Sequence, residues 1–229
     1  CKKIMEKFKP DVVIGVGGYV TYPVIRAAHS LSIKTFIHEQ NSIAGKSNIT
    51  LAKYVDLVGV SFENSKDYFK TARKVVWTGN PCGENAKSAS KISKTTLGFK
   101  ESDKLIIIVA GSLGSSAFNE KFKAFLKTVD DAPYKILYVT GKKYYDDFIS
   151  NSNFSKNVKV VPYFDNLSGL MKDAYLLISR AGASTISEIL ALKIPSILIP
   201  SPYVANNHQY YNALDLVNLG VAELIEEKN

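Results

Sequence analysis

Residues 180–188, Arg-Ala-Gly-Ala-Ser-Thr-Ile-Ser-Glu, combine a turn of small residues with a carboxylate about one helical turn farther along the chain. The turn follows the apolar run 174–179, which is predicted to be a buried strand, and precedes residues with helical spacing, 186–192. Backbone N–H groups at the start of such a helix lack helical partners and carry partial positive charge, so they can bind a phosphate. The Glu188 carboxylate could reach the hydroxyl groups of a ribose. This segment therefore predicts a site for a nucleotide-linked substrate.

Glu188 also has a structural interpretation. Thr185-Ile-Ser-Glu188 fits the capping box S/T-x-x-E, in which the glutamate bonds back to the backbone of the cap residue. Spacing alone slightly favours capping, and both interpretations stay open at this point.

Two further turns are rich in small residues, at 15–18 and 111–116. Neither they nor 181–185 match the dinucleotide fingerprint G-x-G-x-x-G, and the sequence has no Walker A lysine. Each turn alone is explained by a tight connection between a strand and a helix. All three fall at the ends of predicted strands, where α/β proteins bind ligands, so together they favour phosphate or sugar-phosphate binding.

Two polar clusters also follow predicted strands. His38-Glu-Gln-Asn41 resembles half of a zinc motif but lacks the second histidine, so we expect no metal there. Its Asn and Glu could bind a hydroxylated ligand, or the Asn could cap a turn. Residues 206–212 begin a predicted helix in which Gln209 could face the same crevice as Glu188; the alternative is plain capping by Asn206 or Asn207. No Cys-His or Ser-His-Asp order supports a nucleophilic site.

The elements that position these residues alternate between apolar strands and amphipathic helices. The predicted strands are 11–15, 35–37, 57–60, 75–77, 105–110, 135–139, 158–161, 176–178 and 196–199. The predicted helices are 23–30, 46–53, 63–70, 119–128 and 207–219. The polar, serine-rich residues 83–104 are predicted to be a linker with a small helix. This alternation predicts an α/β protein with two Rossmann-like, parallel-sheet domains.

Composition and charge narrow the classes of function. Apolar residues make up 46% of the chain and charged residues 22%, as in soluble globular proteins, and no apolar run approaches the roughly 18 residues of a membrane span. Much of the net charge of +8 lies in residues 1–83, with 12 Lys+Arg and 6 Asp+Glu. This excess fits an anionic partner and an ordinary solvated surface equally well. Because no basic cluster is interleaved with aromatic residues, nucleic acid is not expected. The two cysteines, without metal-ligand spacing, fit a reducing cytoplasm.

Taken together, these motifs resemble those of the MurG glycosyltransferases, which transfer N-acetylglucosamine from UDP-GlcNAc to lipid I to make lipid II for peptidoglycan. The resemblance covers nearly the whole chain, in order, through segments 11–20, 38–45, 79–81, 111–114, 180–188 and 208–213. It implies a GT-B fold, in which two Rossmann-like domains face each other across a cleft, with the first domain incomplete. It also implies that residues 1–82 belong to the acceptor and membrane-side domain, 83–104 to the linker, and 105–229 to the UDP-sugar-binding domain.

The same resemblance implies the substrate contacts. Asn41 would lie near the sugar, Ser112 would meet the pyrophosphate, and the backbone of Phe164 would hold the uracil. Gln209 would bind the hydroxyls of N-acetylglucosamine. The diphosphate and the ribose would be bound by Ala183, Ser184, Thr185, Ile186, Ser187 and Glu188, with Glu188 on the ribose hydroxyls. No metal and no cofactor is implied.

The implied reaction is an inverting, metal-independent transfer, in which the acceptor hydroxyl attacks the anomeric carbon and UDP leaves. Helix N-termini and backbone N–H groups can stabilise the charge that develops on the pyrophosphate. The implied partners are UDP-GlcNAc, lipid I and an anionic membrane surface. The implied location is peripheral, on the cytoplasmic face of the bacterial cell membrane, with roles in cell-wall biogenesis, cell shape and cell division.

Two departures from the family pattern bear on activity. The chain begins at Cys1, without the Gly-rich, His-containing loop that holds a candidate general base in the family, so we expect a fragment. Gly83 stands where the family usually has an arginine. We predict that these 229 residues bind UDP-GlcNAc but show little or no transferase activity; full turnover by this chain alone would contradict this. The alternatives are a related GT-B lipid glycosyltransferase and a degenerate, non-catalytic, nucleotide-binding cell-wall protein.

Overall fold

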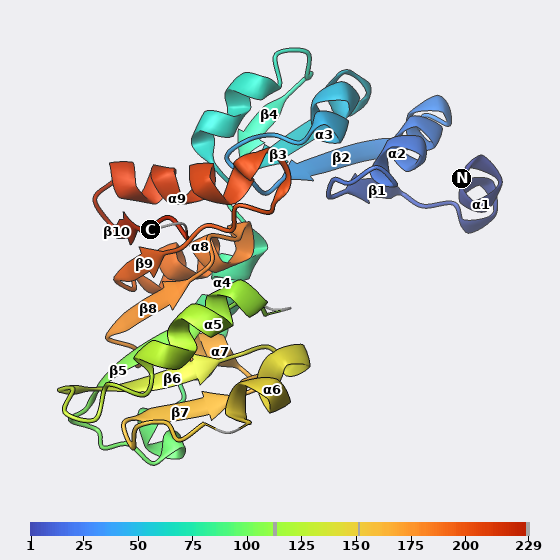
Figure 1. Cartoon of the computed structure of the whole chain (residues 1–229). Helices are drawn as coiled ribbons and strands as arrows, with labels where there is room; N and C mark the ends of the chain where they lie inside the picture. Colours follow the sequence, from blue (N-terminus) through green and yellow to red (C-terminus); the bar gives the residue numbers. More distant parts are fainter. Residues whose placement is uncertain (112–113, 151, 228–229) are drawn as a thin grey trace. The chain divides into compact units, whose positions relative to one another are not determined.

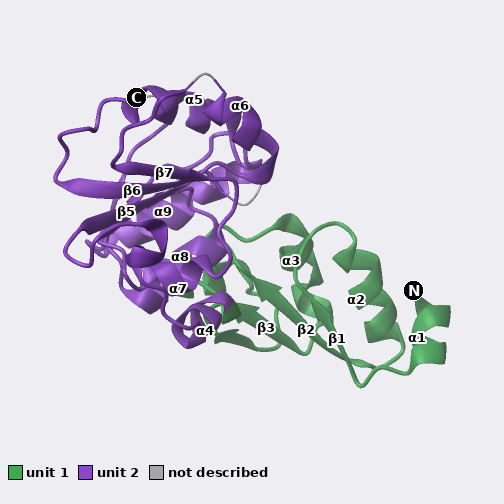
Figure 2. Cartoon of the chain, turned by 90° about the horizontal axis from the view of Figure 1, so that it is seen from below, with its two compact units in different colours: residues 1–81 green, residues 82–229 purple. Residues whose placement is uncertain are grey.

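Short apolar runs form strands, and the strands assemble into two parallel sheets in the computed structural model of the chain (Figure 1). The structure describes residues 1–111, 114–150 and 152–227. The chain divides into two compact units, residues 1–81 (unit 1) and 82–229 (unit 2), which Figure 2 colours separately. Two units, each built on a parallel sheet with helices, confirm the predicted α/β class.

Unit 1 contains a four-stranded sheet in the order β1-β2-β3-β4. Its strands are β1 (Val12–Gly15), β2 (Lys34–Glu39), β3 (Leu57–Val60) and β4 (Val75–Trp77). Its helices are α1 (Lys2–Phe8), α2 (Thr21–Ser30) and α3 (Lys46–Leu51), with the 3-10 helices η1 (Ala52–Tyr54) and η2 (Glu63–Tyr68). Each strand pairs in parallel with the next one in the sequence, so the intervening helices act as crossover connections.

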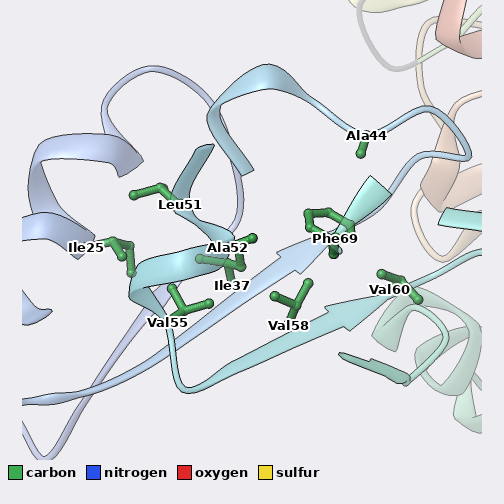
Figure 3. Close-up of a cluster of buried hydrophobic side chains, with 9 residues drawn as sticks. All are labelled: Ile25, Ile37, Ala44, Leu51, Ala52, Val55, Val58, Val60 and Phe69. Atoms are coloured by element: carbon green, nitrogen blue, oxygen red, sulfur yellow. The ribbon is translucent and has the colours of Figure 1, made fainter. Parts of the chain in front are cut away.

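The core of unit 1 lies between its sheet and the helices that follow β1 and β2. Ile37 on β2, Val58 on β3 and Leu51 on α3 are fully buried. Figure 3 shows the side chains of the cluster distributed along β2 and β3; its members are Ile25, Ile37, Ala44, Leu51, Ala52, Val55, Val58, Val60 and Phe69. Burial of apolar surface contributes about 25 cal/mol per Å². The segment that follows β2 is therefore held on the sheet by its own apolar residues.

Unit 2 contains a six-stranded sheet in the order β10-β9-β8-β5-β6-β7. Its strands are β5 (Lys104–Val109), β6 (Tyr134–Val139), β7 (Val158–Val161), β8 (Leu176–Ser179), β9 (Ser196–Leu198) and β10 (Ala222–Leu224). Its longer helices are α4 (Pro81–Ser88), α5 (Ser116–Phe125), α8 (Ala183–Leu192) and α9 (His208–Asn218). Its shorter ones are α6 (Tyr145–Ile149), α7 (Leu167–Met171), η3 (Lys94–Leu97), η4 (Lys142–Tyr144) and η5 (Ala205–Asn207).

The strand order of unit 2 reverses between its two central strands, β5 and β8. From β5 the chain continues outward through β6 and β7, and it then returns to β8 and continues outward through β9 and β10. Val109 at the end of β5 pairs with Ser179 at the end of β8. Such a reversal opens a crevice outside the carboxyl ends of the two strands, where open α/β sheets bind ligands. The turns after β5 and β8 lie at this crevice.

The central strand β5 is buried on both faces. Ile108 packs in one cluster with Phe118 of α5 and Phe148 of α6. Its neighbour Ile107, which points to the opposite face of the sheet, is also fully buried. This explains why β5 appears in the sequence as a continuous apolar run rather than an alternating one.

The predicted strands are confirmed, with ends that differ by at most two residues. The helix predicted at 119–128 begins earlier, at Ser116, because the Ser115 hydroxyl accepts the Phe118 amide at 3.4 Å and caps it. Residues 63–68 form a 3-10 helix in place of the predicted α-helix. The elements α6, α7 and β10 are absent from the prediction because three to five residues are too short to show a helical or strand period.

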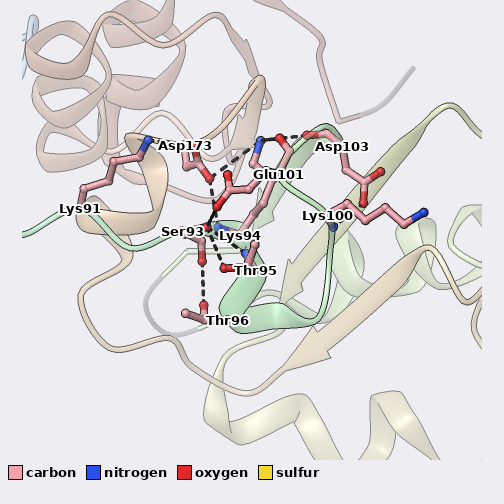
Figure 4. Close-up of polar contacts among 9 residues, drawn as sticks. All are labelled: Lys91, Ser93, Lys94, Thr95, Thr96, Lys100, Glu101, Asp103 and Asp173. Carbon is pink, nitrogen blue, oxygen red and sulfur yellow. Dashed lines mark hydrogen bonds and ion pairs between the residues drawn. The ribbon is translucent and has the colours of Figure 1, made fainter.

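Residues 83–104, predicted to be a linker, pack within unit 2. The backbone N–H of Lys94 donates to Asp173 at 3.0 Å, and its buried ammonium donates to the Asp103 carbonyl at 2.9 Å. Lys91 forms an ion pair with Asp173 at 3.1 Å (Figure 4). The polar composition does not reveal that Lys91 and Lys94 bind Asp173 on the loop before β8, or that the Lys94 ammonium finds an acceptor within its own segment.

The carboxylate of Asp173 gives a first stability prediction. We expect Asp173→Asn to lower the free energy of unfolding by about 1–2 kcal/mol at pH 7, because the substitution weakens hydrogen bonds to a charged group. Burial raises the pKa of Asp173, but the Lys94 N–H and the neighbouring lysine charges outweigh burial, so this pKa lies below its ordinary value. A group with a depressed folded-state pKa stabilises the protein above its unfolded pKa and loses that effect as the pH falls through the folded value.

Urea unfolding followed by far-UV circular dichroism should therefore show a difference between Asp173→Asn and the wild type at pH 7 that shrinks below about pH 4. Glu84→Gln is the matched control, because Glu84 pairs with Lys87 at 3.4 Å on the exposed surface. We expect this control to change the free energy of unfolding by less than about 0.5 kcal/mol. If Asp173→Asn lowers the free energy of unfolding equally at pH 7 and pH 3, the charged carboxylate of Asp173 is not the source of the stabilisation.

Candidate functional site

The turns that follow β5 and β8 meet at the crevice of unit 2. Gly111 and Gly114, in the turn after β5, have φ angles of 94° and 73°, which favour glycine. A Cβ added to Gly111 would lie 3.8 Å from Cγ of Arg180, in the turn after β8. The two turns are therefore neighbours in space. The predicted pyrophosphate ligand Ser112 lies outside the described residues.

Helix α8 begins at the carboxyl end of β8 without a side-chain cap. Its N-cap is Gly182, and the first helical bond joins the Ile186 amide to the Gly182 carbonyl at 2.9 Å. The backbone N–H groups of Ala183, Ser184 and Thr185 precede that bond, so they point out of the helix end. Together they provide the partial positive charge that suits an anionic group.

The side chains of the predicted 183–188 segment differ in their availability. Ile186 is buried in the core, and the Ser187 hydroxyl donates to the Ala183 carbonyl at 2.8 Å within the helix. Ser184 is exposed and Thr185 is half-buried. Contacts from this segment to a ligand would thus come from the first backbone amides, from these two hydroxyls and from Glu188.

Glu188 does not cap α8. The helix starts at Ala183, so Thr185 is inside it and cannot be the first residue of a capping box. The structure therefore contradicts the capping interpretation. Instead, Oε1 of Glu188 accepts the hydroxyl of Ser168 on α7 at 3.2 Å. Burial raises the pKa of Glu188, and the Ser168 hydrogen bond lowers it by a smaller amount.

Phe164 lies in the loop between β7 and α7 and is half-buried. This loop leads into the helix that carries Ser168, whose hydroxyl contacts Glu188. The chain that includes Phe164 thus approaches α8 from the side of α7. Neither α7 nor Ser168 is predicted from the sequence, because α7 has only five residues and the contact joins residues 20 positions apart.

Gln209 stands in the first turn of α9, where Oε1 accepts the Ser201 amide at 2.9 Å. The alternative of capping by Asn206 or Asn207 is wrong, because both have positive φ angles, 55° and 49°, and neither side chain caps the helix. Farther along α9, Asn212 donates to the Ala181 carbonyl at 3.2 Å. This bond ties α9 to the turn after β8, so Gln209 belongs to a helix that packs at the crevice.

Arg180, the first residue of the most distinctive motif, is a structural residue. Its guanidinium pairs with Glu227 at 2.8 Å and donates to the Ser115 hydroxyl at 2.9 Å and to the Ile199 carbonyl at 3.1 Å. It also lies over the Phe118 ring, 4.8 Å from its centre. These contacts join the turn after β8 to the cap of α5 and to the end of β9.

The His38–Asn41 cluster of unit 1 is organised around a buried carboxylate. Glu39 is 2% exposed and accepts the amides of Asn41 at 3.0 Å and Gly45 at 2.9 Å, together with the Asn48 side chain at 2.9 Å. The Glu39 carboxylate thus holds the loop after β2 through several of its donors. His38 is also buried, with Nε2 2.9 Å from the Gly79 carbonyl. Asn41 is half-buried at the carboxyl end of β2.

Gly83 permits close packing of α4 on α8. A Cβ added there would lie 3.2 Å from the Ser187 carbonyl oxygen and 3.3 Å from the Ala191 Cβ. At these distances, a side chain at this position would require its neighbours on α8 to shift by a few tenths of an ångström. Gly83 thus lets α4 and α8 approach closely at the position where the family pattern has an arginine.

A cavity of about 260 Å³ lies beside the crevice, at the carboxyl ends of β9 and β10. Its lining is Pro200, Pro202, Asn207, Tyr210, Glu226 and Glu227, none of which is a predicted substrate contact. Within the described ranges, no group of three or more His, Cys, Asp or Glu residues is placed to hold a metal ion. In the same ranges, every helix is too short or too polar to cross a bilayer.

Comparison with known proteins identifies the family. Residues 105–229 match the glycosyltransferase family 28 C-terminal domain, and residues 1–60 match the glycosyltransferase family 28 N-terminal domain. The chain belongs to glycosyltransferase family 28. The C-terminal family 28 match alone covers more than half of the chain and contains both turns at the crevice.

Individual family 28 relatives agree with this assignment. A protein of Caldanaerobacter subterraneus subsp. tengcongensis is 46% identical over 99% of this chain and 64% of its own length. It is named UDP-N-acetylglucosamine--N-acetylmuramyl-(pentapeptide) pyrophosphoryl-undecaprenol N-acetylglucosamine transferase. A protein of Bacillus cytotoxicus with the same name is 40% identical over 100% of this chain and 64% of its own length.

A solved structure supports the same relationship. The crystal structure of MurG from Acinetobacter baumannii matches 99% of this chain and 63% of its own length, with a TM-score of 0.76 and 29% identity. The chain thus spans about 64% of the length of the curated relatives described above. These matches confirm the predicted resemblance to the MurG glycosyltransferases.

Proposed function

We propose that this chain is part of a glycosyltransferase that moves N-acetylglucosamine from UDP-GlcNAc to undecaprenyl-pyrophosphoryl-MurNAc-pentapeptide, converting lipid I to lipid II. The observation that carries the proposal is the uncapped start of α8 at the crevice of unit 2, with the half-buried Glu188 on the same helix. This combination offers donors for a diphosphate and an acceptor for ribose hydroxyls. The names of the relatives support the same donor and acceptor.

Unit 2 would bind the nucleotide. The backbone N–H groups of Ala183, Ser184 and Thr185 would donate to the diphosphate, and the Glu188 carboxylate would accept the ribose hydroxyls. The turn after β5, which includes Ser112, would meet the pyrophosphate from the neighbouring strand. All of these groups follow β5 or β8 at the reversal of strand order, which supports their joint use.

The remaining donor contacts would come from loops beside α8. The backbone of Phe164 would hold the uracil. The amide group of Gln209 would bind the hydroxyls of N-acetylglucosamine, with its orientation set by the Ser201 amide that bonds its oxygen. On unit 1, Asn41 would lie near the sugar, on the loop that Glu39 stabilises.

The proposed chemistry is an inverting displacement without a metal ion. The acceptor hydroxyl attacks the anomeric carbon, the bond from that carbon to the UDP oxygen breaks, and a base takes the hydroxyl proton. The negative charge that develops on UDP faces the start of α8, whose dipole and N–H groups stabilise it. We assign no residue of this chain as the base.

Unit 1 would belong to the acceptor side, at the cytoplasmic face of the membrane. It matches the family 28 N-terminal domain and carries much of the chain's positive charge. On α1, Ile4 and Phe8 are 71% and 78% exposed, beside Lys2, Lys3 and Lys7. Exposed apolar and basic side chains on one short helix suit peripheral attachment to anionic lipid.

Donor binding tests the proposal. We expect UDP-GlcNAc to raise the melting temperature of the chain more than UDP-glucose at equal concentration, because a ligand that binds only the folded state stabilises it. We expect Glu188→Ala to weaken UDP-GlcNAc binding by about 10- to 100-fold in isothermal titration calorimetry. The ribose hydroxyls would lose hydrogen bonds to a charged carboxylate, and bonds of this kind contribute about 1.5–3 kcal/mol. Glu223→Ala, an exposed carboxylate on β10, is the matched control and should bind like the wild type.

The outcomes separate the alternatives. Equal stabilisation by UDP-glucose would favour a related lipid glycosyltransferase of GT-B architecture. No stabilisation by either nucleotide sugar would contradict the proposal and favour the degenerate, non-catalytic protein. Gly83 gives this last outcome specific support, because the arginine of the family pattern is absent from this position.

A further inference from the structure

Helix α7 is a short helix whose position is set by the segment before β5. The Asn166 side chain caps it, accepting the Gly169 amide at 3.1 Å, and donates to the Ser90 carbonyl at 3.0 Å. The Ile92 amide donates in turn to the Gly169 carbonyl at 3.0 Å. A Cβ added to Gly169 would collide with the Ser90 carbonyl oxygen. The first turn of α7 is therefore held against residues 90–92 with no space between them.

A second set of contacts holds the far end of α7. Asp173, two residues beyond the helix, accepts the Lys94 amide at 3.0 Å and pairs with Lys91 at 3.1 Å (Figure 4). Both ends of this five-residue helix are thus bonded to residues 90–94. This arrangement fixes the backbone of Ser168, which lies in the first turn of α7.

Ser168 uses that fixed position to contact Glu188. Its hydroxyl donates to Oε1 of Glu188 at 3.2 Å and so joins α7 to α8 through two residues that are 20 positions apart. Glu188 is half-buried, so its carboxylate has lost part of its hydration, and the hydroxyl replaces some of the lost hydrogen bonding. The contact also selects one orientation of a side chain that otherwise has several rotamers.

We infer that Ser168 is a positioning residue for the nucleotide site, which holds the Glu188 carboxylate ready to accept the ribose hydroxyls of a uridine nucleotide. The inference rests on the proposed function and adds to it a residue that touches Glu188 rather than the ligand. A carboxylate oriented before binding loses less conformational freedom when the ligand arrives. Its other acceptor positions stay available for the ligand, because the Ser168 bond uses only one oxygen.

Selectivity for the ribose hydroxyl is the decisive measurement. Isothermal titration calorimetry measures the affinities of UDP and 2′-deoxy-UDP for the whole wild-type chain and for its Ser168→Ala and Ser168→Thr variants. We expect the wild type to prefer UDP by about tenfold, the ratio for one hydrogen bond to a charged group. We expect Ser168→Ala to reduce this preference to about threefold or less, with little change for 2′-deoxy-UDP, and Ser168→Thr to keep it because the hydroxyl is retained.

The ionisation of Glu188 gives a second readout. The Ser168 hydrogen bond lowers the pKa of Glu188 against the effect of burial, so its removal raises this pKa. UDP binding by Ser168→Ala should therefore be lost at a higher pH than in the wild type as the solution is acidified. Ser90→Ala is the matched control, since it is the Ser90 carbonyl that holds Asn166. It should match the wild type in both measurements.

The possible results distinguish this inference from the proposed function. In one outcome, the wild type prefers UDP over 2′-deoxy-UDP and Ser168→Ala shows the same preference. This result overturns the inference and leaves the proposed function standing. A wild-type chain that binds neither nucleotide overturns both. Loss of affinity for both nucleotides by the same factor in Ser168→Ala would indicate a merely structural serine, and it would also overturn the inference.

Discussion

Replacement of Arg180 by alanine is expected to lower the free energy of unfolding of unit 2 by about 3–5 kcal/mol. The guanidinium pairs with Glu227 at 2.8 Å, with both side chains 8% exposed, and it bonds Ser115 and the Ile199 carbonyl. Without it, the buried Glu227 carboxylate loses its ion-pair partner and the Ile199 carbonyl loses a donor. Urea unfolding followed by far-UV circular dichroism measures the loss.

Unit 1 supplies an internal control for that experiment. The chain has one tryptophan, Trp77, whose indole N–H donates to the Ser61 carbonyl at 3.0 Å within unit 1. Its fluorescence reports unfolding of unit 1, and Arg180→Ala should leave that transition unchanged. Arg180→Lys should fall between the wild type and the alanine variant, because one ammonium cannot reproduce the planar set of donors. A loss below about 1 kcal/mol would show that the ion pair is not the buried link described here.

The second large effect is expected in unit 1, from Glu39→Ala. The buried carboxylate accepts two backbone amides and the Asn48 side chain, all at 2.9–3.0 Å. Its removal takes away an acceptor shared by three donors, and each lost hydrogen bond to a charged group costs about 1.5–3 kcal/mol before relaxation. We expect a loss of about 3–5 kcal/mol in the urea transition followed by Trp77 fluorescence.

A surface glutamate of the same unit is the control. Glu63 pairs with Lys66 at 3.0 Å and is 61% exposed, so Glu63→Ala should cost less than about 1 kcal/mol. Glu39→Gln keeps one side-chain oxygen as an acceptor and should lie between the two variants. If Glu39→Ala and Glu63→Ala have equal effects, the loop after β2 is not organised by Glu39.

These two variants separate two roles that one motif can contain. In residues 180–188, Arg180 supports the turn, whereas the amides that follow Gly182 and the Glu188 carboxylate are the candidate ligand contacts. In residues 38–41, Glu39 supports the loop that presents Asn41. A loss of nucleotide binding after a change at Arg180 or Glu39 would therefore report damage to the scaffold first.

The sequence predicted the strands well because apolar runs of this length are a local signal. Residues 57–60, 75–77 and 158–161 match β3, β4 and β7 without any shift. The turns after β5 and β8 were predicted as sites for the same reason, since small residues between a strand and a helix are visible locally. Short elements such as α7 were not, because five residues carry no period.

By itself, the sequence determined the α/β class, the order of the strands along the chain and the positions of the small-residue turns, all of which depend on neighbouring residues. Only the tertiary structure decided which partners the polar side chains have. It pairs Arg180 with Glu227, and it gives Glu188 a partner on α7 in place of the cap that local spacing favoured. The physical reason is that side-chain hydrogen bonds and ion pairs form across space, so their partners follow from the packing of helices on the sheet rather than from intervals along the chain.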